Sequence, residues 1–224
     1  MNESRISSSI LCLLATFCFA SCAAHKNTYI SQLPPLSTGD LIFLDLDCGD
    51  LCDSIENVTL EQFEVSGPRL SHLGIVEVID GIPSVLEAWS KGGVREVTME
   101  SFLGRVNGAL NSPEGFYVGR LKPEYRSMGQ EAVKRIRVQL GKPYDDVFNW
   151  AHDRFYCSEL VSFGFAGMEV FKPRPMFFGK RKSKELKRWE SYYQDLGVPV
   201  PDRELGISPL GIYLEGQKRL FLKN

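Results

Sequence analysis

One cysteine, Cys157, has the surroundings expected of a catalytic nucleophile. It stands in Phe155-Tyr-Cys-Ser-Glu-Leu-Val161, where apolar residues at helical spacing predict a helix that starts near the cysteine. The aligned dipoles and free N–H groups at a helix start favour a thiolate. The backbone N–H of Cys157 would also face an oxyanion that forms beside the sulfur. We therefore expect Cys157 to attack a carbonyl carbon.

A cysteine nucleophile needs a base, usually a histidine, and a third group that orients the histidine. The chain has three histidines, of which His25 lies in a polar N-terminal stretch and is set aside. His152 lies in a polar loop five residues before Cys157 and could approach the thiol. No orienting partner is evident for it, because the adjacent Asp153 would point elsewhere. His72 opens a strand-like run and is the other candidate for the base.

A predicted hairpin joins His72 to a carboxylate. Asp80-Gly81 is typical of a two-residue turn between two strands. If these residues form the centre of the turn, His72 faces Trp89, and Glu87 lies diagonally on the same face. A carboxylate there could hold the imidazole in one tautomer, as a catalytic triad requires. On spacing alone, a structural histidine at position 72 is the alternative.

The other elements follow from hydrophobic periodicity, helix caps and turn residues. Residues 45–68 are expected to form a loop with one helical turn or more around 53–64. We expect strands at 41–44, 71–78, 84–89, 94–97 and 115–120, and helices at 127–140 (stopped by Gly141), from about Cys157, along the basic run Lys180–Arg188 to about Tyr193, and from Pro209 after the N-cap Ser208.

The composition is that of a globular protein without a strong net charge. Of 224 residues, 43% are hydrophobic, and 26 basic residues face 28 acidic ones. An apolar fraction of this size excludes a disordered chain, and the near-neutral balance argues against nucleic acid as the main partner. One domain of ordinary size is expected, over residues 37–224.

The N-terminus has the features of an export signal. Its apolar stretch, Ile10 to Ala20, is too short to span a hydrocarbon core of about 30 Å. Ala20 and Ser21 directly before Cys22 resemble a bacterial lipoprotein signal, in which the cysteine receives lipid. We expect 1–21 to be the signal peptide and 22–36 a tether, with the exported chain anchored to a bacterial membrane. An ordinary signal peptide with Cys22 incidental is the alternative.

Cys48 and Cys52 are two of the six cysteines and belong to neither the signal nor the predicted site. An exported protein is in a compartment that permits disulfides, so these two could bridge locally. Two unpaired thiols are the other possibility. Cys-x₃-Cys without further cysteine or histidine partners is a poor zinc signal, and we expect no metal.

Five sequence blocks follow one another along the chain. They are Gly39-Asp-Leu-Ile-Phe43, Ser71-His-Leu-Gly-Ile75, Glu87, Gly141-Lys-Pro-Tyr-Asp145 and Tyr156-Cys-Ser-Glu-Leu-Val161. In this order they resemble the YiiX/YaeF-like proteins, which are circularly permuted papain-like cysteine hydrolases related to the NlpC-type cell-wall peptidases. The resemblance implies an α+β fold in which an antiparallel sheet or partial barrel packs on helices.

The resemblance also implies roles for residues of this chain. Cys157 would be the nucleophile, His72 the base and Glu87 the group that orients it. A tyrosine after a Gly-x-x motif lies beside the active site in NlpC-type relatives, and Tyr144 matches it, although a packing role is equally open. The candidates for binding the substrate or the oxyanion are Tyr144, Ser71 and Tyr156. No metal or organic cofactor is needed.

The implied reaction is hydrolysis of an amide through a thioester. Similarity to the cell-wall enzymes suggests a bond in a peptidoglycan stem peptide, or in a small amide. A lipid- or acyl-directed thiol hydrolase or acyltransferase on the same fold is one alternative. A non-catalytic surface lipoprotein that binds peptides or glycans is the other.

Overall fold

The computed structural model describes residues 33–46, 48–106 and 115–222. The chain divides into two units, and the folded domain is the second, Pro35–Asn224. The predicted signal peptide, Cys22 and most of the tether lie outside the described residues. Among the helices of the described part, none is both long enough and apolar enough to cross a membrane.

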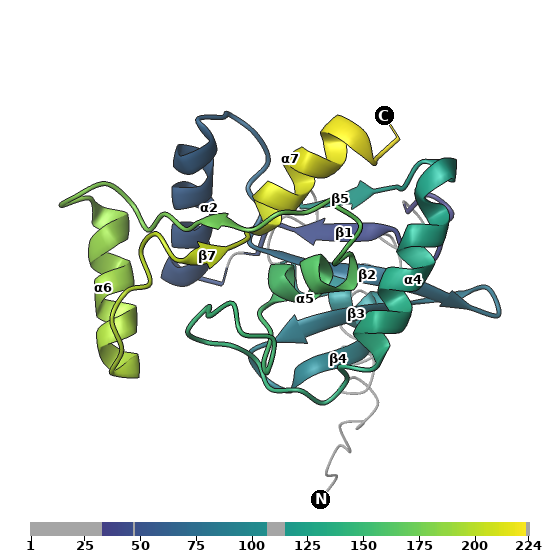
Figure 1. Cartoon of the computed structure of the whole chain (residues 1–224), viewed down its shortest axis with the longest axis horizontal. Coiled ribbons are helices and arrows are strands. Elements are labelled where there is room, and N and C mark those ends of the chain that lie inside the picture. The colour runs from purple at the N-terminus through teal and green to yellow at the C-terminus, as the bar shows by residue number, and fades with distance from the viewer. Residues whose placement is uncertain (1–32, 47, 107–114, 223–224) are drawn as a thin grey trace, which may run out of the picture. The chain divides into compact units, whose positions relative to one another are not determined.

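The centre of this unit is a five-stranded sheet in the order β4-β3-β2-β1-β5, with every neighbouring pair antiparallel (Figure 1). Ile79 pairs with Ile82, so Asp80-Gly81 is a two-residue turn, as expected. The predicted strands are present, with ends that differ by at most two residues. They are β1 (Leu41–Leu44), β2 (His72–Ile79), β3 (Ile82–Trp89), β4 (Gly93–Thr98) and β5 (Phe116–Gly119).

Helices pack around this sheet. In Figure 1, α5 lies in front of the middle of the sheet and α4 runs beside it. The helices are α2 (Asp50–Phe63), α3 (Met99–Leu103), α4 (Arg126–Arg137), α5 (Cys157–Gly164), α6 (Lys184–Leu196) and α7 (Pro209–Arg219), with a 3₁₀ turn, η2, at Pro123–Tyr125. A small second sheet pairs β6 (Arg174–Pro175) with β7 (Leu205–Gly206).

The main core lies between the sheet and the helices α4, α5 and α7. Alternate strand residues such as Leu73 and Ile75 point into it and meet Leu160 of α5. The helices α4 and α5 approach closely at Gly164, where a Cβ atom would lie 2.7 Å from Ile136 Cδ1. A side chain here would displace the end of Ile136, so glycine favours the close contact between α4 and the helix that begins with Cys157.

Three helix boundaries follow local sequence signals. α5 begins at Cys157, as expected. α7 begins at Pro209, and the Ser208 hydroxyl accepts the Gly211 N–H at 3.1 Å, which is the predicted N-cap. α4 ends at Arg137, three residues before the predicted end, and the chain turns at Gly141 with φ 86°.

Two predictions about helices need correction. The helical turn expected around 53–64 within the loop 45–68 is part of a longer, 14-residue helix, α2. Contact with α6 helps to stabilise its full length, because Val58 of α2 and Trp189 of α6 share a second apolar cluster, and such long-range burial leaves only a weak local signal. The basic run is expected to be helical from Lys180, but α6 starts at Lys184, where Ser183 caps it.

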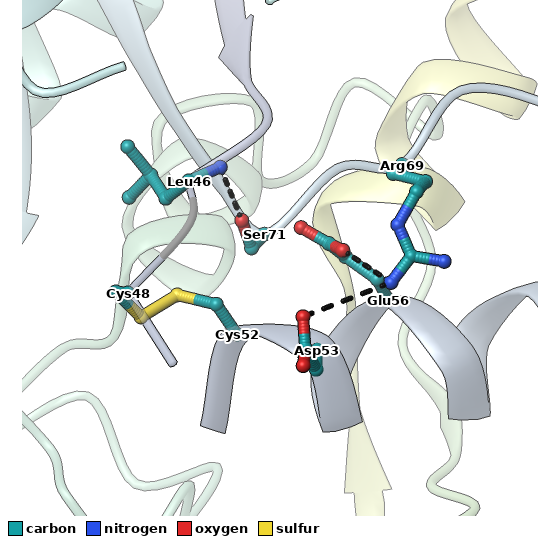
Figure 2. The surroundings of a disulfide bond; sticks show 7 residues. All are labelled: Leu46, Cys48, Cys52, Asp53, Glu56, Arg69 and Ser71. Atoms are coloured by element: carbon teal, nitrogen blue, oxygen red, sulfur yellow. Dashed lines mark hydrogen bonds and ion pairs between the residues drawn. A yellow bond between two sulfur atoms is a disulfide. The ribbon is translucent and has the colours of Figure 1, made fainter. Parts of the chain in front are cut away.

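A disulfide between Cys48 and Cys52 fastens the segment after β1 to the first turn of α2 (Figure 2). The Ser71 hydroxyl accepts the Leu46 N–H at 2.9 Å and ties the same segment to the residue before His72. Of the two possibilities for Cys48 and Cys52, the structure therefore contains the local disulfide and not two unpaired thiols.

An ion pair also holds α2 to the entry of β2. Arg69 Nη2 lies 2.8 Å from Glu56 Oε2 and 3.9 Å from Asp53 Oδ1 (Figure 2). Burial, together with the nearby charge of Asp45, raises the pKa of Glu56 to about 7. Helix α2 thus carries a buried carboxyl group, that of Glu56, which titrates near neutral pH.

Candidate active site

Cys157 and His72 are each the first residue of their element, α5 and β2, and both are buried. Burial alone would lower the pKa of His72, but hydrogen bonds and charge interactions with Cys157 and Glu87 outweigh it and raise the pKa. The two neighbours of the ring therefore strengthen its affinity for a proton, which a base that accepts the thiol proton requires.

The other side of the imidazole meets Glu87. His72 Nε2 lies 2.7 Å from Glu87 Oε2, which leaves Nδ1 as the ring nitrogen available to the thiol. The register between β2 and β3, extended to the start of β2, places His72 opposite Trp89. The two rings meet edge to face with centroids 5.0 Å apart. The hairpin therefore has the register expected from its two-residue turn, with Glu87 diagonal to the histidine.

Two arginines complete the surroundings of Glu87. Arg95, directly opposite on β4, donates from Nε to Oε1 at 3.0 Å, and Arg105 donates from Nη2 to Oε2 at 2.8 Å. Burial would raise the pKa of Glu87, but its bonds to His72 and Arg105 lower it to about 2. The carboxylate is therefore ionised at any physiological pH and can stabilise an imidazolium.

Sequence reasoning missed both arginines. The signal for Arg95 was present, because the hairpin register extended to β4 places it opposite Glu87. Arg105 follows α3, and no local pattern predicts where its side chain points. Its guanidinium lies 4.3 Å from the Trp89 ring centroid, so the same aromatic residue packs against His72 and Arg105.

The two neighbours of Cys157 anchor the start of α5 to one residue. Ser158 Oγ donates to the Ile207 carbonyl at 2.8 Å, and the Ile207 N–H donates to Tyr156 Oη at 3.1 Å. These bonds fix the first turn of α5 to the segment that leads into α7. The Cys157 N–H, in the first turn, needs no intrahelical acceptor and can serve as an oxyanion donor.

Tyr144, Ser71 and Tyr156 all line the pocket that reaches Cys157. Burial, with a contribution from Cys157, raises the pKa of Tyr144 well above its ordinary value, so its hydroxyl stays protonated and can donate. Ser71 Oγ and Tyr156 Oη each accept a backbone N–H within the fold. Burial also raises the pKa of Tyr156, so both tyrosine hydroxyls stay protonated and can donate a hydrogen bond.

The pocket beside Cys157 is a cavity of about 100 Å³ with predominantly apolar walls. Aromatic and aliphatic side chains reach it from α2, from the segments before α5 and α6, and from α6 itself. Examples are Ile55, Val58, Phe148, Met176, Phe178 and Trp189. Two cationic residues, Lys172 and Arg174, also line it.

His152 differs from its predicted surroundings. The sequence shows no partner that could orient this histidine, but in the structure its Nδ1 lies 2.9 Å from Glu159 Oε1 on α5. It is not among the described residues that line the pocket at Cys157. Burial lowers the pKa of His152, and burial with the nearby Asp145 raises the pKa of Glu159 to about 8. This second pair joins the loop before α5 to the helix.

Residues 35–205 match the model of a protein family described as a permuted papain-like amidase enzyme, YaeF/YiiX, C92 family. The chain belongs to this family. It is therefore an enzyme of the cysteine peptidase and amidase class, and its sheet packed against the cysteine-bearing helix is the permuted papain-like fold.

Two relatives illustrate the membership. The chain is 30% identical over 186 residues to an uncharacterised protein, YiiX, of Escherichia coli strain K12, covering 79% of this chain and 81% of that protein. It also resembles the crystal structure of YiiX from Escherichia coli O157:H7, with a TM-score of 0.61, 23% identity, and coverage of 80% and 93%. The second likeness concerns the fold.

The crystal structure of that C92 relative is described as one of a metalloprotein. In the described part of this chain, histidine, cysteine, aspartate and glutamate side chains do not gather in a group of three or more that could hold a metal. At the Cys157 site, both Glu87 oxygens already bind cationic groups, Oε1 on Arg95 and Oε2 on Arg105. These residues do not fit a metal ion, and no step of the reaction is derived through one.

Proposed function

We propose that this C92 family member hydrolyses an amide with Cys157 as nucleophile, His72 as base and acid, and Glu87 as the group that orients the imidazole. The observation that carries the proposal is the continuous arrangement of Cys157, His72 and the ionised Glu87 at the start of α5. In support, Glu87 is ionised and bonded to the imidazole, as the role of an orienting group requires.

The reaction begins when the Cys157 thiol proton moves to His72 and the sulfur attacks the amide carbon. The carbonyl oxygen becomes an oxyanion, which the Cys157 N–H and the Tyr144 hydroxyl stabilise. The imidazolium then protonates the leaving amine, the C–N bond breaks and a thioester remains. His72 next takes a proton from water, the hydroxide attacks the thioester, and the C–S bond breaks to release the acid and the thiol.

The pocket favours a substrate that carries an apolar group next to the scissile amide. Its walls come from aromatic and aliphatic side chains of α2, α6 and the segments before α5 and α6, which would remove such a group from water. This supports an acyl-directed thiol hydrolase over an enzyme for uniformly polar peptides. The same thioester step serves a water molecule or another acyl acceptor.

A peptidoglycan stem peptide is the second candidate. The observation that favours it is the pair Lys172 and Arg174 in the lining of the pocket, since stem peptides carry carboxylates. Both cations already pair with acidic residues, Lys172 with Glu169 and Arg174 with Glu215. A peptide carboxylate would therefore compete with carboxylates of the protein, and the apolar walls weigh more.

We further propose that the enzyme works at a bacterial membrane, held by lipid on Cys22. The support is the sequence alone, in which small residues and Cys22 follow an apolar export segment. Mass spectrometry of the chain purified from a membrane fraction tests this. Diacylglycerol on Cys22 supports it, and an unmodified Cys22 or a chain cleaved elsewhere overturns it.

A matched pair of histidine variants tests the proposed catalysis. His72→Ala and His152→Ala each remove an imidazole that binds a buried glutamate, but only the first faces Cys157. The assay follows alkylation of Cys157 by iodoacetamide at neutral pH, together with hydrolysis of a fatty-acyl amide and a synthetic stem peptide. We expect His72→Ala to lose both activities and His152→Ala to keep them.

Cys157→Ala should abolish hydrolysis of either substrate. Equal rates for this variant and the wild type would remove Cys157 from the mechanism. If the wild type cleaves the stem peptide and not the fatty-acyl amide, the stem peptide becomes the favoured substrate class. Alkylation of Cys157 no faster than that of an exposed thiol would contradict the activated triad.

A further inference from the structure

The backbone of Phe148, in the loop between Tyr144 and α5, has a left-handed conformation with φ 55°. This conformation is uncommon outside glycine, asparagine and aspartate, and it is strained for a bulky aromatic residue. A residue stays in such a conformation only where its surroundings over-determine it, and such residues cluster at functional sites. The contacts that hold Phe148 therefore bear on what its ring does.

On one side, a buried carboxylate holds the loop. Asp145 accepts the Val147 N–H on Oδ1 at 3.1 Å and the Asn149 N–H on Oδ2. These two amides flank Phe148 directly. Asp145 is itself fully buried, and its own N–H donates to the Phe155 carbonyl at 3.1 Å, so the clamp is anchored to the residues before α5.

On the other side, two hydroxyls of α6 hold the same loop. Tyr192 donates to the Asp146 carbonyl at 2.7 Å, and Tyr193 donates to the Val147 carbonyl at 3.3 Å. Four hydrogen bonds from two separate elements thus fix the backbone around Phe148. None of them involves the backbone of Phe148, so the residues beside Phe148 determine where its side chain lies.

The ring of Phe148 lies between the start of α5 and the aromatic cluster of α6. Its centroid is 5.2 Å from that of Tyr156, the residue before Cys157, and 5.9 Å from that of Trp189, both edge to face. It lines the pocket that reaches the sulfur and packs against the second apolar cluster. The strained backbone therefore places one ring where the pocket leads from Cys157 toward α6.

We propose that Phe148 is the residue that limits the size of the apolar group accepted beside Cys157. The inference rests on the proposed function, because it assumes that the group attached to the reacting carbon enters this pocket. Cys157 and Trp189 line the same pocket, and removal of the ring widens it between them. Wider groups then reach Cys157, while the thiol, His72 and Glu87 are unchanged.

Alkylation of Cys157 tests this without knowledge of the natural substrate. The thiolate displaces iodide from an iodoacetamide, so that a C–S bond forms, the C–I bond breaks and the thiol proton passes to His72. Iodoacetamide is compared with a derivative whose amide carries a naphthylmethyl group, and labelling of Cys157 is followed by peptide mass spectrometry on the full chain. For Phe148→Ala we expect the ratio of the naphthylmethyl rate to the iodoacetamide rate to rise roughly tenfold, an ordinary effect of pocket size.

Trp150→Ala is the matched control, because it truncates an aromatic residue of the same loop that is not among the described pocket residues. Its ratio should equal that of the wild type. Phe148→Asn removes the same ring but suits the left-handed backbone, so it should show the raised ratio with a higher melting temperature than Phe148→Ala. A lower melting temperature for Phe148→Asn would contradict the strained conformation.

The two proposals fail in different ways. A wild-type Cys157 that reacts with iodoacetamide no faster than an exposed thiol overturns the proposed function. A reactive Cys157 whose ratio is the same in wild type, Phe148→Ala and Phe148→Asn overturns only the role of Phe148.

Discussion

His72 Nε2 lies 2.7 Å from Glu87 Oε2 on two strands joined by a turn of only two residues. The proposed base and its orienting acid therefore lie on one local hairpin, whereas the proposed nucleophile lies on a separate helix. Arg95 and Arg105, which follow this hairpin in the chain, both bind the Glu87 carboxylate. The imidazole has a defined orientation before any substrate enters, which is the preorganisation that electrostatic catalysis requires.

Glu87→Gln should lower the turnover number roughly 100-fold or more, the scale on which general acid–base catalysis contributes. The amide has no charge to stabilise the imidazolium, and its NH₂ group can turn toward His72 in place of the oxygen. Steady-state hydrolysis measures the effect. Glu77→Gln is the control, since Glu77 on β2 also binds an arginine, Arg137, away from the pocket. Equal loss in both variants would mean that an arginine partner, rather than the histidine, is what matters.

Acid unfolding should reveal the same carboxylate. The pKa of Glu87 is about 2 in the folded chain and 4.5 ordinarily, so the unfolded chain takes up the proton first as the pH falls. Its contribution, about 3 kcal/mol, is present above pH 4.5 and is lost between pH 4.5 and 2.

The measurement is the difference in unfolding free energy between the wild type and Glu87→Gln, obtained from urea titrations at several pH values. This difference should shrink as the pH falls from 4.5 toward 2. A difference that stays constant across this range would show that the carboxylate is not preferentially ionised in the fold.

Glu159 should have the opposite effect. Its pKa is about 8 in the folded chain against 4.5 ordinarily, so the folded state keeps a proton that the unfolded state has lost. The stability linked to this proton is fully present below pH 4.5 and is lost as the pH rises to 8. The loss is about 1.4 kcal/mol for each pH unit in this window.

Glu159→Gln removes this titration but can keep an acceptor for His152. The variant should resemble the wild type near pH 4.5 and be more stable than it near pH 8, as measured by urea unfolding at both values. Glu56 titrates in both proteins, and its contribution cancels in the comparison. An equal gap at the two pH values would show that Glu159 is ionised within the folded chain.

Replacement of both Cys48 and Cys52 by serine should lower the unfolding free energy by about 2 kcal/mol, as expected for a cross-link across so short a loop. The bridge lies at the start of α2, away from the contacts of His72 and Glu87, so the alkylation rate of Cys157 should stay within a factor of two. Urea unfolding and iodoacetamide labelling measure the two quantities. A large loss of Cys157 reactivity at unchanged stability would assign the bridge to the site instead of to the fold.

The sequence was most informative where a short range of residues decides the structure. The hairpin that carries His72 and Glu87 depends on strand alternation and on Asp80-Gly81. The start of α7 depends on Ser208 and Pro209. In each case the signal and the structure lie within a few residues of each other, so no knowledge of the rest of the chain was needed.

What could not be predicted depends on distant contacts. Helix α2 is held by α6, by the ion pair of Glu56 with Arg69, and by a disulfide. Arg105 reaches Glu87 from beyond α3. The conformation of Phe148 depends on hydroxyls of α6 that follow it by more than forty residues. The partner of His152, Glu159, is close in sequence, but its side chain reaches back from the first turn of α5, and no local pattern predicts that direction.

The order of the elements along the chain determines when the reactive centre is complete. During synthesis the hairpin with His72 and Glu87 emerges long before Cys157, and Ile207, which anchors both neighbours of the cysteine, emerges after it. A partly synthesised chain therefore lacks first Cys157 and then the two hydrogen bonds that anchor the start of α5. Truncation before Ile207 would remove these anchors although Cys157, His72 and Glu87 all remain in the chain.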